Sequence, residues 1–434
     1  MDRTYRRPMP ASRSIPIAAF GLLAACARGA PEPPTPIVTE PFDPKPITIA
    51  LDGLPPPNAT ESARRTPQMV PPPEPPVLRA PAGFRVSLYY TGSLEKPRWL
   101  ALTPEGDVLV TETRKNRILR LRDINGDGTA DEATTFADEG NGLDIPFGMA
   151  FTSDHFYVGN TNAVLRWPYG KGQARRLDGA GEKITDLPGG GYNQHWTRNV
   201  RVSPDGAHLF VTVGSQSNND EEQPPRACVL RMKLDGSGRE VFADGLRNPV
   251  GLDFEPRTGE PYVTVNERDG LGDDLVPDYL TRVRAGEFFG WPWAYLSSTH
   301  LDPRWVRDGG STRPEAVVRT KTPDLLLQAH SAALGLAFYR GDAFPPKYRR
   351  GAFVALRGSW NRNIGTGYQL IFVPFGDDGR PLGHYEPFVT GFLVDAHRPA
   401  TWGRPVGVLV LPDGSLLFTE EENQRLYRVS YRPS

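Results

Sequence analysis

Cysteine is nearly missing from this chain of 434 residues, which has only Cys26 and Cys228. Two cysteines cannot build the disulfide framework that stabilises small secreted domains. An excess of one charge is missing too, because 50 Lys and Arg residues stand against 51 Asp and Glu residues, for a net charge of −1. This balance lacks the basic surface of a nucleic-acid-binding protein, so we expect no such partner.

The N-terminus lacks an apolar run long enough to span a membrane. Basic residues, among them Arg3 and Arg13, precede the apolar run 15–23, and Leu-Ala-Ala-Cys follows at 23–26. This order predicts a secretory signal peptide over residues 1–25. A cysteine after Leu-Ala-Ala also resembles the bacterial lipobox, which predicts lipidation of Cys26 and an exported lipoprotein, periplasmic or anchored to the outer membrane. An ordinary signal peptide with an incidental cysteine is the alternative.

Proline is concentrated directly after this signal. Residues 27–82 hold 17 of the 45 prolines, and a segment of this composition stays extended and buries little apolar surface. We therefore expect residues 26–82 to be a disordered Pro-rich tether that carries the folded domain from Cys26. A proline-motif ligand for another domain is the alternative. Cys228 lies in the apolar phrase ACVLRM and is expected to be a small buried hydrophobic residue.

The rest of the chain repeats one phrase six times: a turn, an alternating apolar strand, a Pro/Asp-Gly corner and a second strand. Repeats of about four strands over roughly 40–50 residues are typical of propeller blades. We therefore predict an all-β fold, a six-bladed β-propeller of four-stranded antiparallel blades over residues 83–434. The copies begin at Arg98, Pro146, Thr197, Pro249, Ala333 and Arg404.

An extra strand precedes the first repeat. Residues 83–92 alternate apolar and polar side chains, and the last repeat ends at the C-terminus. This arrangement predicts that the N-terminal and C-terminal strands pair and close the ring, which would cover edges that otherwise favour aggregation. The fourth and fifth repeats carry insertions near residues 270–330, and long insertions in such folds lie in loops that often carry function.

A propeller brings together, on one face, the loop that enters each innermost strand and the loop that leaves its second strand. Here those loops carry two histidines, several arginines and an acidic Gly-rich segment. An excess of arginine favours a planar polyanionic ligand, because a guanidinium group pairs with carboxylates and stacks on rings. The candidates are Arg98, His195, Arg247, Asn248, His330 and Arg404 before first strands, and Ser215, Asn266 to Asp269, Arg357 to Arg362 and Glu420 to Glu422 after second strands.

Several phrases together carry a resemblance to a known family: GYNQHWTRNVRVSPDG, GLRNPVGLDFEP, VNERDGLGDD with FFGWPWAY, HSAALGLAFY and RGSWNR. In this order they resemble the glucose/sorbosone dehydrogenase family, exported six-bladed propellers that use pyrroloquinoline quinone (PQQ). The resemblance covers residues 83–434. It implies oxidation of a sugar or polyol, with hydride transfer to PQQ and calcium as a second cofactor.

The resemblance also implies roles for individual residues. His195 takes the position of the general base, whose ordinary pKa near 6.5 suits proton abstraction. Arg247 and Asn248 match the pair that holds the quinone carbonyls. Cationic positions for the cofactor fall on Arg268, Arg357 and Arg404, and the backbone carbonyls of Asp269 and Gly270 match ligands of the calcium ion that accompanies PQQ.

The chain departs from the family at some positions. Relatives have an acidic residue where Ser215 stands, and some have a second calcium site whose glutamate is replaced by Leu275. The glutamine beside the substrate in glucose-oxidising relatives has only Asp144 nearby, so substrate preference is not carried over. Without the family, His195 reads as a histidine that bonds to a neighbouring blade.

A separate pattern lies at 123–131, where Asp123, Asn125, Asp127 and Asp131 alternate with other residues around Gly128. Such alternation matches the front of a calcium loop, which makes a second calcium site one interpretation. An Asp/Asn/Gly hairpin turn is the other. The run 420–422 is expected to be a solvated or arginine-pairing loop.

The sequence thus predicts an exported PQQ- and Ca²⁺-dependent sugar dehydrogenase that acts on a small-molecule sugar or polyol, passes electrons to an unidentified acceptor and touches the membrane only through its lipid anchor. Two other functions remain open. One is a catalytically inactive propeller that serves as a binding or scaffold lipoprotein. The other is a calcium-dependent lactonase, which would need several convergent carboxylates and asparagines on the axis.

Overall fold

The computed structural model describes residues 36–170, 172 and 176–433. The predicted signal peptide and Cys26 lie outside the described residues. The described residues form one compact unit. Its secondary structure is almost entirely strand, and its single α-helix within the described residues, α1, spans only Pro314–Val317. The predicted all-β class is confirmed.

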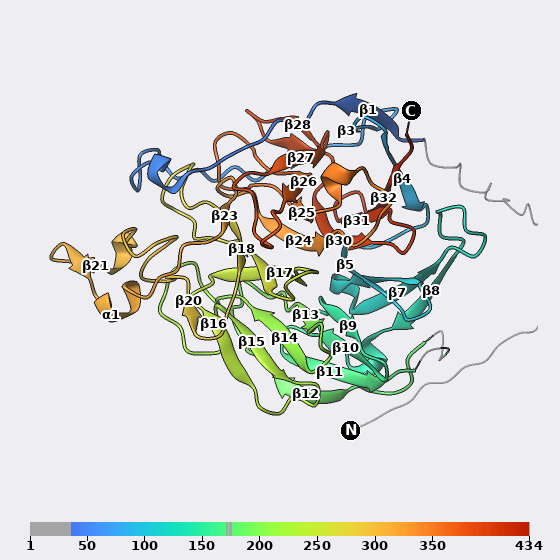
Figure 1. Cartoon of the computed structure of the whole chain (residues 1–434), viewed down its shortest axis with the longest axis horizontal. Helices are drawn as coiled ribbons and strands as arrows, with labels where there is room; N and C mark the ends of the chain where they lie inside the picture. The colour runs from blue at the N-terminus through green and yellow to red at the C-terminus, as the bar shows by residue number, and fades with distance from the viewer. Residues whose placement is uncertain (1–35, 171, 173–175, 434) are drawn as a thin grey trace, which may run out of the picture. The chain divides into compact units, whose positions relative to one another are not determined.

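Six sheets of four or five strands make up most of the described chain (Figure 1). We number them 1 to 6 in chain order. Sheet 1 is β5 (Pro97–Leu102), β6 (Val108–Glu112), β7 (Arg117–Arg122) and β8 (Glu132–Ala137). Sheet 2 is β9 (Met149–Phe151), β10 (His155–Gly159), β11 (Ala163–Pro168) and β12 (Glu182–Asp186). Sheet 3 is β13 (Val200–Val202), β14 (His208–Val213), β15 (Cys228–Lys233) and β16 (Glu240–Asp244), extended by β20 (Glu287–Phe288).

The other three sheets include the longer insertions and the closing strand. Sheet 4 is β17 (Asn248–Phe254), β18 (Pro261–Asn266), β19 (Tyr279–Arg282) and β23 (Leu325–Leu326). Sheet 5 is β24 (Ala333–Phe338), β25 (Gly351–Leu356), β26 (Gln369–Pro374) and β27 (Glu386–Val389). Sheet 6 is β30 (Pro405–Val410), β31 (Leu416–Glu420), β32 (Arg425–Tyr431) and β4 (Phe84–Tyr90).

The first strands of these sheets lie around a common centre (Figure 1). Each of them contacts the first strand of the next sheet, and β30 contacts β5, so the contacts form a cycle. Strands β17 and β24 are buried along their whole length because neighbours cover both faces. Glycines let these strands approach: a Cβ on Gly335 would meet the carbonyl oxygen of Val406 at 2.3 Å, and one on Gly407 would meet that of Arg98 at 2.3 Å.

The predicted pairing between the two ends of the folded chain is confirmed. Strand β4 pairs antiparallel with β32, with Phe84 opposite Tyr431 and Val86 opposite Val429. Phe84 also packs edge-on against Phe344, in the loop between β24 and β25 of sheet 5, with 4.8 Å between ring centroids. The closing strand therefore joins sheet 6 by hydrogen bonds and sheet 5 by aromatic packing.

The prediction of a disordered tether over 26–82 is wrong for residues 36–82, which fold onto the sheets. Strand β1 (Val38–Phe42) pairs in parallel with β3 (Val77–Pro81). Strand β2 (Gln68–Met69) pairs with β29 (Ala400–Thr401), which also pairs with β28 (Leu393–Asp395). Proline tolerates such edge positions because it needs no amide partner there. The prediction of disorder followed from the proline content alone. The apolar residues between the prolines stabilise the folded segment, because Ile47 and Ile49 pack onto the core.

The remaining elements are short. The predicted insertion near 270–330 contains α1, the 3₁₀ turn η4 (Pro303–Trp305) and the hairpin of β21 (Val306–Arg307) and β22 (Gly310–Ser311). Cys228 is buried with a free thiol, as expected. No helix in residues 36–170 and 176–433 has the length and apolar character needed to cross a bilayer. The other 3₁₀ turns are η1 (Leu51–Gly53), η2 (Thr113–Lys115), η3 (Glu139–Asn141) and η5 (Pro346–Tyr348).

Candidate functional site

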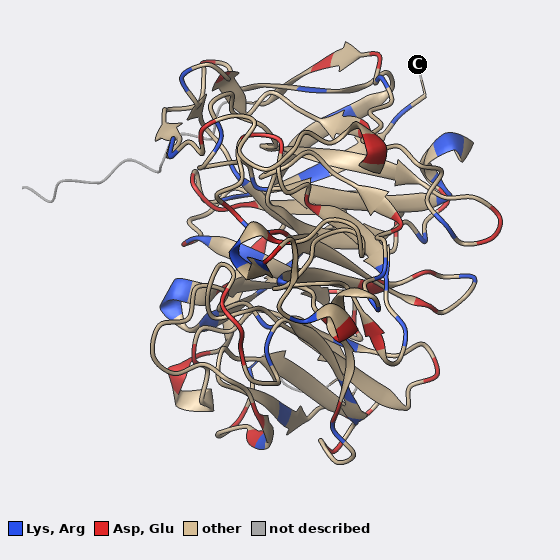
Figure 2. Cartoon of the chain, turned by 90° about the vertical axis from the view of Figure 1, so that its left-hand side faces the viewer, with Lys and Arg blue, Asp and Glu red and all other residues tan. Residues whose placement is uncertain are grey.

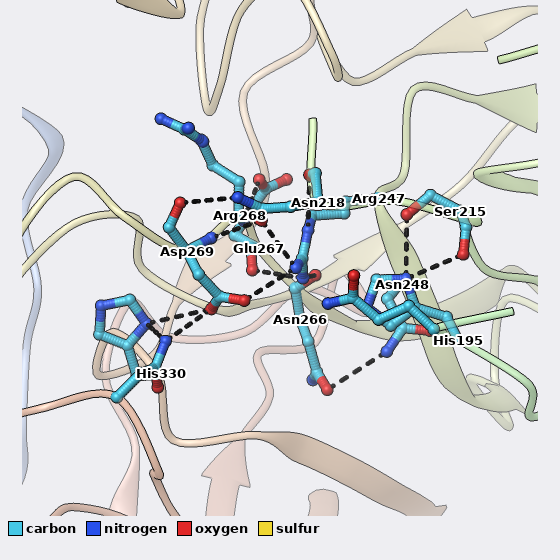
Figure 3. A network of polar contacts seen from close by, with 12 residues as sticks. His195, Ser215, Asn218, Arg247, Asn248, Asn266, Glu267, Arg268, Asp269 and His330 are labelled. Carbon is cyan, nitrogen blue, oxygen red and sulfur yellow. Dashed lines mark hydrogen bonds and ion pairs between the residues drawn. The ribbon is translucent and has the colours of Figure 1, made fainter. Parts of the chain in front are cut away.

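A cavity of about 480 Å³ lies where the first strands begin and the second strands end. Its walls come from loops of several sheets, as the arrangement of equivalent loops predicts. Many of the residues singled out from the sequence line it, among them His195, Arg247, Asn248, Asp269, His330 and Arg357. His195 and Arg247, 52 positions apart in the sequence, therefore share one cavity (Figure 3).

The imidazole of His195 is fixed through one of its two nitrogens. Nδ1 lies 3.0 Å from the carbonyl oxygen of Ser215 and 2.9 Å from the Ser215 hydroxyl. Because a carbonyl oxygen can only accept, Nδ1 carries the proton, and Nε2 keeps its lone pair. The Ser215 hydroxyl in turn donates to the carbonyl of Ser217 at 2.6 Å. Ser215 thus orients the ring at the position where relatives have an acidic residue.

Burial, with the positive charge of Arg247 as the next cause, holds the pKa of His195 well below its usual value. Both effects disfavour the imidazolium form. His195 is therefore neutral at neutral pH, in the form that accepts a proton.

Arg247 is held by partners on two loops (Figure 3). Its Nε donates to the carbonyl of Asn218 at 3.0 Å, and its Nη2 donates to the Asn218 side chain at 2.9 Å and to Asp269 Oδ2 at 3.0 Å. Its Nη1 donates to the carbonyl of Glu267 at 2.6 Å. Sequence reasoning missed Asn218, which also donates to the carbonyl of Asp269 at 3.0 Å. The guanidinium group is thus preorganised.

Asp269 connects Arg247 with a second histidine. Its Oδ1 accepts a hydrogen bond from Asn361 at 2.7 Å and lies 3.6 Å from His330 Nδ1. Burial alone would raise the pKa of Asp269, but Arg247 and His330 lower it to about 2. Burial alone would lower the pKa of His330, but the contacts with Asp269 and with the Gly272 carbonyl, together with the charges of Asp269 and Asp278, outweigh burial and raise it. His330, a rim candidate from the sequence, is a buried member of this network.

On another wall of the cavity, one carboxylate clamps two guanidinium groups. Glu421 forms ion pairs with Arg98 and with Arg357. Burial alone would raise the pKa of Glu421, but these two arginines lower it to about 2. The expectation of an arginine-pairing loop at 420–422 is confirmed.

Two predicted cofactor-binding arginines do not reach the cavity. Among the described lining residues neither Arg268 nor Arg404 occurs. Arg268 forms an ion pair with Asp302, 3.2 Å away in the insertion. Arg404 donates to the carbonyls of Arg357 at 3.1 Å and Gly358 at 2.7 Å. Arg404 therefore supports the loop that carries Arg357, and cofactor contact by Arg268 and Arg404 stays a prediction without support from the cavity walls.

The 123–131 loop has the geometry of a hairpin turn. Asp123 accepts backbone amides of Gly126 and Gly128 at 2.8 Å each, and Asp131 accepts that of Ile124 at 2.7 Å. Within the described residues, no group of three or more His, Cys, Asp and Glu side chains could hold a metal ion. These contacts favour the turn, and calcium binding by Asp123, Asn125, Asp127 and Asp131 stays a prediction without support from the geometry.

Some buried polar atoms of the cavity have no partner among the described residues: Nε of Arg98, Oδ1 of Asn248 and Oε1 of Glu267. Unpaired buried polar atoms are costly, so a cavity that holds donors and acceptors of this kind suits a polar ligand. Trp196, next to His195, offers an aromatic face there, and Arg98 and Arg114 lie 5.1 Å and 5.5 Å from its ring centroid. Sequence reasoning did not single out Trp196, although its place beside the candidate base was a usable signal.

Comparisons with known proteins found a matching family and several relatives. A family described as TrAA12-like matches residues 78–277 and 308–432. An uncharacterized protein of Borreliella burgdorferi is 29% identical over 366 residues, covering 82% of this chain and 91% of that protein. A pyrroloquinoline quinone-dependent pyranose dehydrogenase of Coprinopsis cinerea is 25% identical over 398 residues. That match covers 78% of this chain and 52% of the dehydrogenase, so the chain spans about half of that protein's length.

Solved structures show the same fold. The PQQ domain of pyranose dehydrogenase from Coprinopsis cinerea, in its holo form, aligns with a TM-score of 0.66 at 20% identity, covering 81% of this chain and 97% of that one. The calcium structure of a Trichoderma reesei family AA12 carbohydrate-active enzyme aligns with a TM-score of 0.67 at 19% identity, covering 86% and 99%. The resemblance to PQQ-dependent sugar dehydrogenases found in the sequence is confirmed at the level of the family.

Proposed function

The chain belongs to the TrAA12-like family, and from this premise we propose that it is a PQQ- and Ca²⁺-dependent dehydrogenase that oxidises a sugar or polyol. The observation that carries the proposal is the convergence of a neutral, oriented histidine and a preorganised arginine in one cavity. The names of the Coprinopsis and Trichoderma relatives point to the same cofactors. The scaffold in this proposal is a six-bladed propeller, which the cycle of contacts between first strands supports.

The cavity suits PQQ in size and in chemistry. Its volume of about 480 Å³ lies within the range of roughly 300–1,000 Å³ for small-molecule sites. PQQ is planar and carries carboxylates, and the guanidinium groups of Arg98, Arg247 and Arg357 on the walls are donors of the matching geometry. The unpaired Nε of Arg98 and Oδ1 of Asn248 would find partners on such a guest. Trp196 offers a face for stacking.

When bound, PQQ supplies the two-electron acceptor for the hydride of the substrate. His195 takes the proton of the substrate hydroxyl on Nε2, because Nδ1 is occupied by Ser215. Arg247 and Asn248 would hold and orient the cofactor, and the positive charge of Arg247 would stabilise negative charge that develops beside it. Ser215 takes the orienting role of the family's acidic residue without adding a negative charge beside the base.

Calcium would be held by oxygen atoms of the loop after β18. The carbonyls of Asp269 and Gly270 are its proposed ligands, together with oxygens of the cofactor. Gly270 adopts φ +89°, and a Cβ there would meet nothing within 4 Å, so the backbone at this point is open to a ligand. The carbonyl of Asp269 already accepts one hydrogen bond from Asn218, which leaves its second lone pair.

The two alternative functions predict other sites. A calcium-dependent lactonase needs convergent carboxylates, and within the described residues no acidic or histidine cluster of three or more could hold a metal ion. An inactive binding propeller has no need for a neutral histidine oriented by a carbonyl. Export as a lipoprotein through Cys26 and transfer of electrons to an unidentified acceptor remain part of the proposal.

The proposal is tested by reconstitution of purified protein with PQQ and Ca²⁺, followed by dye reduction with a panel of aldoses. We expect saturable PQQ binding and turnover of at least one sugar. His195→Ala should lower kcat by about 10²- to 10⁴-fold, the usual contribution of a general base, and leave PQQ affinity nearly unchanged.

The matched control is His208→Ala, because His208 begins β14 at the end of sheet 3 remote from the cavity. This variant should turn over like the wild type. Wild-type protein that fails to bind PQQ would end the dehydrogenase proposal. PQQ binding without turnover of any sugar would favour the inactive binding propeller.

A further inference from the structure

Part of the N-terminal segment, residues 58–65, lies against two loops beside the cavity; we name it the strap. The first loop spans residues 267–278 and the second spans residues 357–368. The amide of Asn58 donates to the carbonyl of Leu271 in the first loop at 2.8 Å, and the amide of Arg65 donates to the carbonyl of Trp360 in the second loop at 2.8 Å. The hydroxyl groups of the strap accept from the first loop in return. Thr60 Oγ1 accepts the amide of Asp273 at 2.8 Å, and Ser62 Oγ accepts that of Gly272 at 3.2 Å.

Both loops carry residues of the cavity. The first, residues 267–278, carries Asp269, and the second, residues 357–368, carries Arg357 and Asn361. They are also bonded to each other: Arg362 Nε donates to the carbonyl of Asp273 at 3.0 Å, and Asn361 to Asp269 at 2.7 Å. The strap therefore lies where the two loops meet.

Continuous contacts lead from the strap to Arg247. The amide of Gly272 binds Ser62, and its carbonyl accepts His330 Nε2 at 2.9 Å. His330 faces Asp269, which pairs with Arg247, and the charge of Arg247 acts on His195. A shift of Gly272 would thus change the position of His330 and, through it, of Asp269.

The strap and the first loop are closely fitted at Gly272. This residue has φ +110°, and a Cβ on it would meet Thr60 Oγ1 at 2.9 Å and the Thr60 carbonyl at 3.0 Å. Thr60 and Ser62 themselves are exposed, so burial contributes little to their placement. Apolar residues before the strap, Leu51 and Leu54, pack on the core, and β2 after it pairs with β29. The strap is thus fixed at both ends and bonds to the loop through its middle.

We propose that the strap is a positioning element for the cofactor loop, in which Thr60 and Ser62 hold the backbone of Gly272 and Asp273 so that Asp269 and Gly270 are presented to calcium and cofactor. This inference rests on the proposed function. It gives the Pro-rich segment a role at the site, where the composition alone predicts a passive tether.

The test is the double variant Thr60→Ala/Ser62→Ala. A neutral hydrogen bond contributes about a five- to tenfold factor to an equilibrium. In cofactor-free protein, hydrogen–deuterium exchange of peptides covering 269–275 should become at least about tenfold faster. In calorimetric titrations with PQQ and Ca²⁺, the Kd should rise about tenfold, while the midpoint of thermal unfolding of the cofactor-free protein stays close to that of the wild type.

Two controls separate positioning from general damage. Thr39→Ala removes the same kind of contact from another part of the N-terminal segment. Thr39 lies in β1, which pairs with β3, and its Oγ1 accepts the amide of Val86 in β4 at 2.9 Å, so this contact does not involve the first loop. It should change neither exchange at 269–275 nor cofactor affinity. The conservative variant Thr60→Ser/Ser62→Thr keeps both hydroxyl groups and should restore affinity.

The proposal is overturned if the double variant binds PQQ and Ca²⁺ as tightly as the wild type, even with faster exchange, or if Thr39→Ala weakens binding equally. Failure of the proposed function is a different result. In that case the wild type binds neither cofactor, and faster exchange in the double variant would then show a strap that supports the loop without serving a cofactor, which overturns this inference as well.

Discussion

Burial shifts the pKa values of two side chains near Arg247, His195 and Glu267, in opposite directions. It lowers the pKa of His195 well below its usual value and raises that of Glu267 to about 7. The cause is the same in both cases, since the charged form loses its hydration. Glu267 Oε1 has no partner among the described residues to offset this loss. At neutral pH His195 is therefore uncharged, and Glu267 is about half protonated.

Glu267→Gln should make the cofactor-free protein more stable above pH 7. The folded-state pKa of about 7 exceeds the unfolded value near 4.3, so the folded wild type binds the extra proton between these values. Wild-type stability consequently falls as the pH rises through that range. The variant escapes this loss and should gain about 1–3 kcal/mol at pH 8 and nothing from this cause at pH 4.

Urea unfolding at both pH values measures this difference. Glu315→Gln, an exposed position in α1, is the control and should show no pH-dependent gain. Equal gains for Glu267→Gln at pH 4 and pH 8 would contradict an ionisation effect.

The order of strands and loops made it predictable which residues lie near the cavity, but not where each side chain points. His195, Arg247, Asn248 and His330 reach the cavity because each precedes or begins a first strand. Topology does not decide side-chain direction. Arg268 follows β18 like its neighbours, yet its side chain forms an ion pair with Asp302. Asp302 lies 34 positions later, in an insertion that has no counterpart in the other repeats, so the repeat pattern does not predict this pair.

At the level of elements, the closing strand β4 connects two sheets. Its hydrogen bonds go to β32. Its first residue, Phe84, packs against Phe344, in the loop between β24 and β25, and against Phe388 in β27, at centroid distances of 4.8 Å and 5.0 Å. Aromatic pairs of this geometry add to the gain from burial. The alternation in residues 83–92 made the strand predictable, whereas its aromatic partners depend on packing.

Phe84→Ala should lower the free energy of unfolding by about 3–5 kcal/mol, because it leaves a cavity between sheets 5 and 6. Guanidinium chloride unfolding monitored by tryptophan fluorescence measures the loss. Leu382→Ala, whose side chain is 57% exposed, is the control and should cost less than about 0.5 kcal/mol. A similar small cost for Phe84→Ala would mean that β4 contributes little to closure.

The segment 36–82 shows where composition misleads. Proline content predicts an extended chain, and β1 and β3 are indeed extended, but extended chain can also pair at an edge. What decides between the two is whether apolar side chains find a surface. Ile47 and Ile49 pack against apolar residues of sheets 4 and 5. Those residues lie more than 200 positions later in the sequence, so the local composition of the segment does not reveal this surface.

For the whole molecule, acidic and basic residues are distributed over all sheets and loops, and Figure 2 shows the two signs intermixed. Stability gained on ligand binding must therefore come from the site itself. PQQ and Ca²⁺ at about 100 times their Kd should add about 2.7 kcal/mol to the free energy of unfolding, because they bind only the folded chain.

Differential scanning calorimetry measures this gain as a higher Tm. Chelation of Ca²⁺ should lower the Tm again, and the cofactor-free protein should show no response to the chelator. A Tm that ignores both cofactors would contradict binding in the cavity.

The cavity walls carry five cationic side chains, Lys96, Arg98, Arg114, Arg247 and Arg357, and as many carboxyl groups, Glu267, Asp269, Asp278, Glu421 and Glu422. Glu421 already occupies the guanidinium forks that an incoming carboxylate would seek. A guest with several negative charges must therefore displace resident counterions or arrive with its own. Joint uptake with a divalent cation solves this problem, so affinity for the organic cofactor should depend steeply on the concentration of free calcium.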